Sequence, residues 1–189
     1  MSKSVVVALA DGFEEMEAVI SIDILRRAGL NAISASISSD LLVRGFRHIT
    51  IQADVFLKDL EIIPDAFLLP GGEKGAKNLA ASEVVNDMLQ ECAHQHKIIA
   101  AICASPACVL AQAGILEGKK ATCYPSFEKL FSDQVLRCED AVVIDGNIIT
   151  SRGPGTVFEF ALKVVEVLCG AQMAEEVMEK ALIGINRKD

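Results

Sequence analysis

Short apolar runs alternate along the chain with longer segments in which apolar residues recur at helical spacing. The short runs are rich in Val, Ile, Leu and Ala and predict buried strands at residues 5–9, 32–37, 66–69 and 98–102. The longer segments predict amphipathic helices at 14–28, 82–96 and 158–168. Strands that alternate with helices are typical of a mostly parallel sheet sandwiched by helices. We therefore expect a single α/β domain over residues 1–189.

Turn and cap residues mark the ends of these elements. Gly29 and Gly170 predict helix C-termini, and Ser82 predicts an N-cap. Asp145-Gly146 predicts a hairpin between the short apolar runs 142–144 and 148–150. The remaining elements are an edge element at 48–52, a helix from Ser105-Pro106 to Gly114, a short strand at 121–123 and a final helix at 177–185.

Composition narrows the class of protein. Apolar residues make up 51% of the chain and charged residues 23%, which excludes a disordered protein. No apolar run is long enough to cross a bilayer, so we expect no membrane partner. Residues 1–10 resemble a short signal peptide, but the acidic segment that follows favours a first strand and a cytoplasmic protein. The net charge of -8 and the scattered basic residues disfavour nucleic-acid binding.

The six cysteines are predicted to remain thiols, because disulfides are rare in chains without a secretory signal. No Cys-X-X-Cys or His-Glu-X-X-His motif is present. The three histidines and the cysteines do not show zinc-ligand spacing. We expect no metal ion and no other cofactor.

Cys103 is the best candidate nucleophile. It follows an apolar run directly, and ligands of open parallel sheets bind beyond the carboxyl ends of the strands. The small residues around it permit a sharp strand-to-helix turn that aims the sulfur outward at a helix N-terminus, which predicts a lowered thiol pKa. A buried structural cysteine fits the same position about equally well.

Two further segments fall at strand ends. Gly71 and Gly72 let the backbone approach a reacting atom, and an N–H from this pair with that of Ala104 would form an oxyanion site. An ordinary Pro-Gly-Gly turn is the alternative. A protonated glutamate among residues 14, 15 and 17 would donate a hydrogen bond to the sulfur, although carboxylates here also stabilise the helix dipole. The residues alone do not choose among the three.

Four segments together resemble the ThiJ/PfpI superfamily, in particular its DJ-one branch. They are Gly12-Phe13-Glu14-Glu15-Met16-Glu17, Leu69-Pro70-Gly71-Gly72, Ala100-Ala101-Ile102-Cys103-Ala104 and Thr150-Ser151-Arg152-Gly153-Pro154-Gly155-Thr156. The resemblance runs from the first strand to the last helix, with the motifs in the same order and at similar spacing. It implies a flavodoxin-like fold of the class I glutamine amidotransferase type and a homodimer.

The resemblance also implies roles for individual residues. Cys103 matches the reactive cysteine, and Glu17 matches the protonated glutamate beside it. Gly72 and Ala104 match the backbone donors. The pocket-lining residues would be Gly71, Arg47, Tyr124, Arg152 and Pro154, and Arg27 matches a basic residue of the dimer interface.

One departure from the family pattern affects the mechanism. Many members carry a histidine in a Thr-His-Pro setting where this chain has Cys123-Tyr124-Pro125. Tyrosine is a poor general base near neutral pH, so Glu17 would have to move the protons. Cys123 itself is either a second reactive thiol or, as a strand position favours, a core residue.

The first functional hypothesis is a cofactor-independent, cysteine-dependent glyoxalase or deglycase. Its substrates would be methylglyoxal, glyoxal or their protein and nucleotide adducts, with Cys103 as nucleophile and Glu17 as proton carrier. The alternative is an oxidative-stress sensor or redox-regulated chaperone that works through oxidation of Cys103 to sulfinic acid. A family label of thiazole biosynthesis has no support in these residues.

Overall fold

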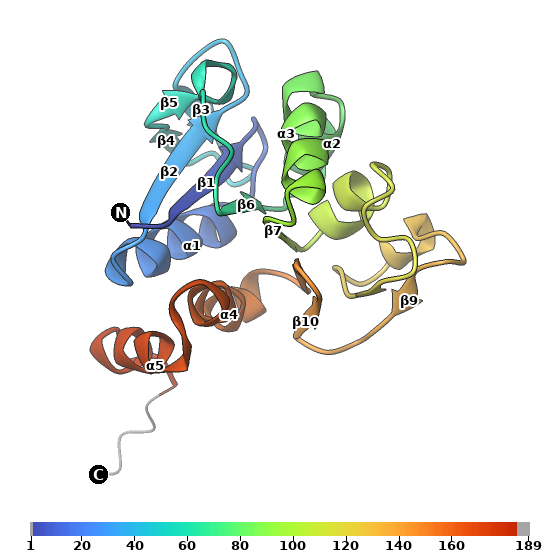
Figure 1. The fold of residues 1–189 in the computed structure, drawn as a ribbon. Helices are drawn as coiled ribbons and strands as arrows, with labels where there is room; N and C mark the ends of the chain where they lie inside the picture. The colour runs from blue at the N-terminus through green and yellow to red at the C-terminus, as the bar shows by residue number, and fades with distance from the viewer. Residues whose placement is uncertain (1, 185–189) are drawn as a thin grey trace.

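A seven-stranded sheet forms the centre of the computed structural model, which describes residues 2–184 (Figure 1). All neighbouring pairs are parallel except the hairpin at one edge. In spatial order the strands are β10 (Val142–Asp145), β11 (Ile148–Ser151), β7 (Ile98–Ile102), β6 (Ala66–Leu69), β1 (Ser4–Leu9), β2 (Asn31–Ser36) and β5 (Val55–Phe56). The predicted fold class is therefore confirmed.

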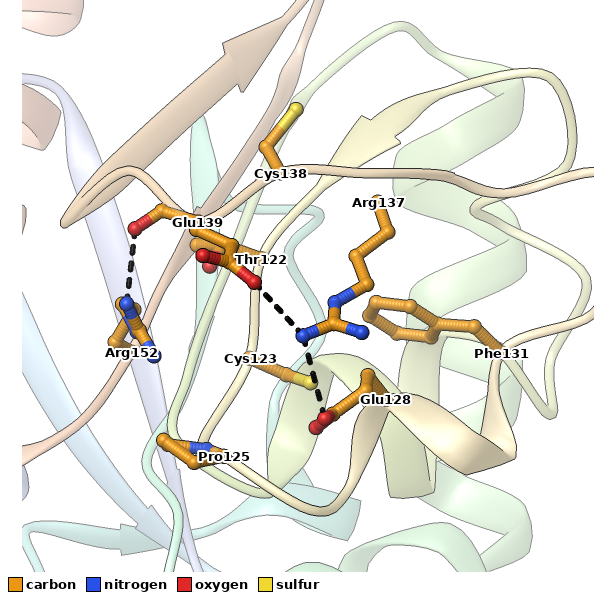
Figure 2. Close-up of a pocket in the computed structure, with 9 residues that line it drawn as sticks. All are labelled: Thr122, Cys123, Pro125, Glu128, Phe131, Arg137, Cys138, Glu139 and Arg152. Atoms are coloured by element: carbon orange, nitrogen blue, oxygen red, sulfur yellow. Dashed lines mark hydrogen bonds and ion pairs between the residues drawn. The ribbon is translucent and has the colours of Figure 1, made fainter.

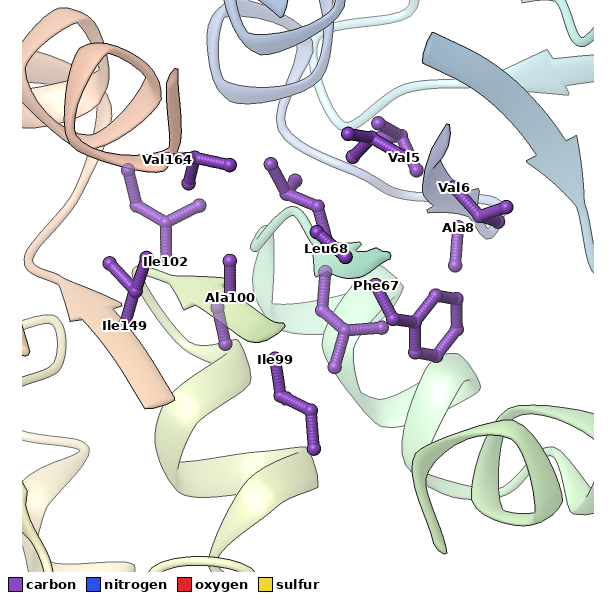
Figure 3. Close-up of a cluster of buried hydrophobic side chains, with 14 of the residues drawn as sticks. Val5, Val6, Ala8, Phe67, Leu68, Ile99, Ala100, Ile102, Ile149 and Val164 are labelled. Atoms are coloured by element: carbon purple, nitrogen blue, oxygen red, sulfur yellow. The ribbon is translucent and has the colours of Figure 1, made fainter. Parts of the chain in front are cut away.

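The central strands are buried on both faces, which explains why they read as continuous apolar runs. Figure 3 shows their side chains packed together, with Ile102 and Ile149 near Val164, which belongs to a helix that covers the sheet. Burying each such side chain contributes about 1.5–3 kcal/mol. This core fixes where the carboxyl end of each strand lies, and so it positions the loops that follow the strands.

Helices cover both faces of the sheet (Figure 1). One layer holds α1 (Glu15–Arg27), α4 (Val157–Cys169) and α5 (Ala171–Lys180), and the other holds α2 (Glu73–Ala80) and α3 (Glu83–His94). The Ser82 hydroxyl caps α3 by accepting the Val85 N–H, as predicted. Gly29 and Gly170 adopt positive φ angles just beyond α1 and α4, which confirms both predicted helix ends.

Among the residues that the structure describes, two small sheets and three short 3-10 turns complete the fold. β3 (Leu42–Arg44) pairs with β4 (Thr50–Gln52), and β8 (Lys120–Ala121) pairs with β9 (Leu136–Arg137). The 3-10 turns lie at Leu57–Asp59, Glu128–Leu130 and Pro154–Thr156. No helix among residues 2–184 combines the length and the apolar character that a membrane span requires.

Several predicted elements have different bounds. The segment 48–52 is not an edge of the main sheet, because β4 pairs only with β3 and the edge is β5. The predicted helix from Ser105 to Gly114 is one wide turn at Pro106–Leu110, followed by irregular turns. The strand expected at 121–123 ends at Ala121.

At the C-terminal end, α5 begins at Ala171, six residues before the predicted start, and ends at Lys180; residue 185 lies outside the described residues. Helix α2 was not predicted, because Gly75 and polar residues interrupt its apolar spacing. Its Gly75 is required by packing, since a Cβ there would lie 2.7 Å from the Phe13 backbone.

The strand order places a topological switch point between β1 and β6. From β1 the chain proceeds outward through β2 and β5, then returns to β6 and proceeds in the opposite direction through β7 and β11. Ligands of doubly wound sheets bind beyond the carboxyl ends of the strands at such a point. Asp11, Gly71 and Cys103 follow the ends of β1, β6 and β7 there.

Candidate active site

Cys103 occupies a strained turn at the end of β7. Its φ angle is 66°, a left-handed conformation that few non-glycine residues adopt. Its N–H donates to the Ser151 carbonyl at 2.9 Å, and its own carbonyl accepts the Tyr124 N–H at 2.8 Å. Only 8% of the residue is exposed. The sharp turn predicted for Cys103 is present, but the residue is buried instead of pointing outward, and a wide turn follows it instead of an α-helix. Backbone strain of this kind is concentrated at functional sites.

Ser105 fastens the other side of this turn. Its buried hydroxyl donates to the Pro70 carbonyl at 2.6 Å and so ties the segment after Cys103 to the loop after β6. The Ala104 carbonyl accepts the Cys108 N–H at 2.8 Å, which starts the wide turn at Pro106–Leu110. We did not predict the role of Ser105, because its partner lies 35 residues away in sequence.

Glu17 is fully buried beside the Cys103 side chain. One carboxyl oxygen, Oε2, accepts the Gly71 N–H at 2.7 Å, whereas Oε1 has no hydrogen-bond partner in the described structure. Burial, with a smaller contribution from the negative charge of Glu14, raises the pKa of Glu17 from 4.5 to about 8. The carboxyl is therefore protonated near neutral pH. Because Oε2 already accepts the Gly71 N–H, Oε1 is the oxygen that is free to carry the proton.

The thiol pKa differs from the sequence-based expectation. Burial, followed by the charge that Glu17 carries when ionised, raises the pKa of Cys103. Hydrogen bonds from the N–H groups of Gly72 and Ala104 lower it, but by less. The prediction of a lowered pKa from the helix end alone was wrong because it ignored the depth of the site. Protonation of Glu17 removes the repulsion between its negative charge and that of the thiolate. The neutral carboxylic acid form of Glu17 is therefore the form that favours a Cys103 thiolate.

Gly71 and Gly72 are required because other parts of the chain lie too close to their α-carbons to leave space for a side chain, and not only because of the turn they form. A Cβ on Gly71 would lie 2.5 Å from the Cys103 Cβ and 2.7 Å from the Glu17 carboxyl. Gly72 has a φ angle of 85°, and a Cβ there would lie 2.9 Å from the Glu14 nitrogen. The two glycines let the strand-end loop reach the sulfur and the carboxyl directly.

The structure assigns a different contact to each of the three glutamates. Glu14 is the N-cap of α1, and its carboxylate accepts the Glu17 N–H at 2.8 Å. The buried Glu15 accepts the N–H groups of Arg47 and Ile49, at 2.6 and 3.3 Å. Only Glu17 reaches Cys103.

The two predicted pocket arginines, Arg47 and Arg152, and the predicted interface residue Arg27 each make a contact with a residue other than Cys103 or Glu17. The Arg47 side chain is exposed, and its guanidinium lies over the Phe46 ring, 5.0 Å from the centroid. Arg27 forms an ion pair with Asp23 at 2.5 Å on the surface of α1. The Arg152 Nη1 donates to the Glu139 carbonyl at 3.0 Å.

Tyr124, Arg152 and Pro154 do share one open groove, with Gly153 between them. A Cβ on Gly153 would lie 3.1 Å from the Tyr124 ring, so this glycine makes room for the aromatic side chain. Tyr124 is also tied to Cys103 through its backbone. These three predicted pocket residues therefore form one wall beside the turn that carries the cysteine.

A water-sized cavity adjoins this groove and shares Pro125, Glu139 and Arg152 with it (Figure 2). Arg137 joins Glu128 and Glu139 there by ion pairs of 3.4 and 3.0 Å. Cys123 lines this cavity, and burial together with the charge of Glu128 raises the pKa of its thiol to about 12. The core interpretation of Cys123 is therefore favoured over a second reactive thiol, although the residue follows a strand rather than belonging to one.

Possible metal ligands are dispersed. Within residues 2–184 no three His, Cys, Asp or Glu side chains gather as a metal-binding group would require. The polar groups that face Cys103 are one carboxyl and two backbone N–H donors. Such a set fits a nucleophile with a proton carrier and donors for a developing negative charge.

Comparison with known proteins identifies the family. The DJ-1/PfpI family profile matches residues 3–167, and the chain belongs to this family. It is similar to the Drosophila melanogaster protein dj-1beta, with 41% identity over 190 residues that cover 98% of this chain and 100% of the relative. The predicted DJ-1 branch is thereby confirmed.

Three further matches bear on the function. Protein DJ-1 homolog B of Arabidopsis thaliana is 43% identical over 95% of this chain, and the chain spans only 41% of that relative's length. The glutathione-independent glyoxalase DJR-1.2 of Caenorhabditis elegans is 36% identical over 168 residues, 88% of each protein. The solved structure of oxidized Toxoplasma gondii DJ-1 superimposes with a TM-score of 0.94 at 39% identity, covering 97% of this chain and 100% of that one.

Proposed function

We propose that this protein is a glutathione-independent glyoxalase or deglycase in which Cys103 is the nucleophile and Glu17 the proton carrier. The observation that carries the proposal is the buried Glu17 carboxyl, whose pKa of about 8 leaves a proton available beside the sulfur near neutral pH. The C. elegans relative named as a glutathione-independent glyoxalase supports the reaction class. The substrates are small 2-oxoaldehydes or the adducts they form.

The first step is addition of the Cys103 thiolate to the aldehyde carbon of methylglyoxal. The C–S bond forms as the carbonyl π bond breaks, and the oxygen takes the electron pair. The N–H groups of Gly72 and Ala104, which face the sulfur, lie next to this developing oxyanion. Glu17 then gives its proton to the oxygen, which produces a neutral hemithioacetal and a Glu17 carboxylate.

The second step moves a proton between neighbouring carbons. The Glu17 carboxylate removes the proton from the former aldehyde carbon, which gives an enediol, and then returns a proton to the adjacent carbon. The hydroxyl proton on the former aldehyde oxygen passes to the neighbouring oxygen, so that the product is a lactoyl thioester. Water then hydrolyses the thioester and releases lactate and the Cys103 thiol. The Cys103 thiol then returns its proton to the Glu17 carboxylate, which restores the starting state. The sum is methylglyoxal plus water to lactate plus one proton, with no external oxidant or reductant.

The test is lactate formation from methylglyoxal without glutathione, in wild type and in Cys103→Ser and Glu17→Gln. Both variants should lose at least about 100-fold in kcat/KM, since positioned acid–base groups contribute about 10²–10⁴-fold. Cys169→Ser is the matched control, because Cys169 is an exposed thiol at the end of α4. Wild type without activity above buffer, or full activity in Cys103→Ser, would refute the proposal.

A second function uses the same residues. The T. gondii structure is described as oxidized, and this chain places Cys103 between a protonated carboxyl and two N–H donors that would hold a sulfinate. We propose oxidation of Cys103 as a regulatory or chaperone switch. Mild peroxide should add two oxygen atoms at Cys103, detected by mass spectrometry. Suppression of aggregation of a client protein only after oxidation would support the sensor, and no change would exclude it.

We also propose a homodimer. Met16 and Val19 are about half exposed on α1, and Ile49 beside the start of that helix is 56% exposed. Such apolar side chains gathered on one face favour association with a second copy. Sedimentation at micromolar concentration should give twice the chain mass of 20.2 kDa.

A further inference from the structure

Glu15 is a second buried carboxyl in the first turn of α1, and the proposed reaction does not use it. Only 5% of the residue is exposed. Its Oε1 accepts the Arg47 N–H at 2.6 Å and the Ile49 N–H at 3.3 Å, whereas the buried Oε2 has no hydrogen-bond partner in the described part of the chain. The ion pairs found within residues 2–184 do not involve Glu15. Burying a carboxyl without a cation is costly, so its contacts require an explanation.

Helix capping does not explain the burial of Glu15. The N-cap of α1 is Glu14, whose carboxylate accepts the Glu17 N–H at 2.8 Å. The Glu15 carboxyl instead accepts backbone N–H groups that lie 32 and 34 residues further along the chain. These groups belong to the loop between β3 and β4. The start of α1 and this loop are therefore joined through one side chain.

The loop between β3 and β4 closes tightly around this carboxyl. The Gly45 N–H donates to the Ile49 carbonyl at 2.8 Å, and the His48 N–H donates to the Gly45 carbonyl at 3.1 Å. A Cβ on Gly45 would overlap with the Glu15 carboxyl, so only glycine leaves space for it. The contact therefore depends on both the carboxyl and the absence of a side chain opposite it.

Backbone contacts continue from this loop to the candidate active site. The Phe46 N–H donates to the Phe13 carbonyl at 2.8 Å, which fixes the loop on the segment after β1. The Glu14 N–H, at the end of that segment, donates to the Gly71 carbonyl at 3.0 Å. Gly71 in turn donates its own N–H to the Glu17 carboxyl at 2.7 Å. The loop and the proton carrier are thus connected through a short series of hydrogen bonds.

Glu15 and Glu17 hold the first turn of α1 from opposite sides. Side chains two positions apart on an α-helix point about 200° apart. Glu15 accordingly contacts the β3–β4 loop, while Glu17 lies against Gly71 and Cys103. Met16 between them is 49% exposed, so it does not anchor the turn. The position of Glu17 relative to the sulfur therefore depends on how firmly Glu15 holds the turn.

From these contacts we propose that Glu15 is a positioning residue, whose hydrogen bonds to the β3–β4 loop keep the first turn of α1 where Glu17 is enclosed beside Cys103. Without these bonds the turn loosens, water reaches the Glu17 carboxyl, and the pKa of that carboxyl falls. The proposal rests on the proposed function only for its effect on turnover, because the titration of Glu17 can be measured without a substrate.

The first measurement is a pH titration of the Glu17 carboxyl by NMR of the side-chain carboxyl carbons, with the signal assigned by its loss in Glu17→Gln. Wild type should titrate with a midpoint of about pH 8. Glu15→Ala should titrate at least about one pH unit lower, because solvation by water favours the ionised form. Glu15→Gln keeps an oxygen that can accept the two loop N–H groups, so its midpoint should stay near that of wild type.

Gly45→Ala tests the same contact from the loop, in a protein that keeps both glutamates. Its Cβ would displace the Glu15 carboxyl, so Glu17 should again titrate at lower pH. Adding Gly45→Ala to Glu15→Ala should shift the midpoint little further, because both changes break one contact. Glu83→Ala is the matched control, since Glu83 is an exposed carboxylate at the first position of α3. It should leave the Glu17 midpoint unchanged.

Three results would overturn the proposal. One is an unchanged Glu17 midpoint in both Glu15→Ala and Gly45→Ala. Another is an equal shift in Glu15→Gln and Glu15→Ala, since the charge of Glu15 would then matter and its hydrogen bonds would not. The third is a lower urea midpoint for Glu15→Ala with an unmoved Glu17 titration, because this is the result of a contact that only stabilises the fold.

The second measurement connects the contact to catalysis. In Glu15→Ala, kcat for methylglyoxal should fall about 10–100-fold, because a small displacement of a catalytic group is costly, and Glu15→Gln should restore most of the loss. A lowered Glu17 midpoint in the variants, together with a wild type that does not turn over methylglyoxal, would contradict the proposed function and leave the positioning role standing. Turnover that Glu15→Ala and Gly45→Ala leave unchanged would contradict the positioning role and leave the proposed function standing.

Discussion

The proton on Glu17 should make the stability of the fold depend on pH near neutrality. The pKa of this carboxyl rises from 4.5 to about 8 on folding, because the folded protein buries it completely. Between these two values the native state holds a proton that the unfolded chain releases. The free energy of unfolding should therefore fall as pH rises, by about 1.4 kcal/mol per pH unit.

The magnitude follows from the same two values. The stabilisation is complete below pH 4.5 and is lost as pH rises through about 8. Between pH 5.5 and 7.5 the wild type should lose about 2–3 kcal/mol through Glu17. Glu17→Gln removes the titration but keeps an oxygen that can accept the Gly71 N–H, so its stability should vary less with pH by this amount.

The assay is urea unfolding of wild type and Glu17→Gln at pH 5.5, 6.5 and 7.5 in constant ionic strength. Glu175→Gln serves as a control that removes one exposed carboxylate from α5. The difference between wild type and Glu17→Gln should shift in favour of the variant as pH rises, whereas the control should follow wild type. Parallel pH profiles for wild type and Glu17→Gln would refute the assignment of a neutral buried carboxyl.

The remaining predictions concern the turn that carries the cysteine. Gly71→Ala should destabilise the fold by about 1–3 kcal/mol in urea unfolding and slow alkylation of Cys103, because its Cβ would collide with the Cys103 Cβ and the Glu17 carboxyl. Ser105→Ala should cost about 1–3 kcal/mol, since it leaves the buried Pro70 carbonyl without its donor; an unchanged denaturation midpoint would contradict this. Cys103→Gly should be more stable than Cys103→Ala by about 1 kcal/mol, because only glycine adopts a φ of 66° without strain. Equal midpoints for these two variants would show that the turn relaxes.

The strands of the central sheet were predicted more accurately from the sequence than the helices and loops around them. The runs at 66–69 and 98–102 match β6 and β7 residue for residue, because a strand buried on both faces leaves an unbroken apolar signal. The segment 48–52 was wrongly predicted to be an edge of the main sheet. Alternation of apolar and polar residues indicates a half-buried strand, but it does not indicate which strand is its partner. Helix α2 was missed because close packing required a glycine inside it.

The candidate site was predictable only where a motif falls at a strand end. The positions of Cys103 and Gly71 follow from the topology, since both come directly after parallel strands. The choice of Glu17 over its two neighbours needed the family resemblance, because helical spacing cannot tell which carboxyl faces another loop. The Ser105 contact and the raised thiol pKa both depend on three-dimensional burial, which no local pattern reports.

The unfavourable backbone at Cys103 and the burial of Glu17 have a common origin. The Cys103 turn is held by its N–H bond to Ser151, by the Tyr124 N–H and by the Ser105 hydroxyl, so three separate segments maintain the φ of 66°. The same turn presses the sulfur against Gly71 and the carboxyl, and leaves no room for water to solvate an ionised Glu17. Relaxing the turn would therefore also lower the pKa of Glu17 and remove the proton that the proposed reaction needs.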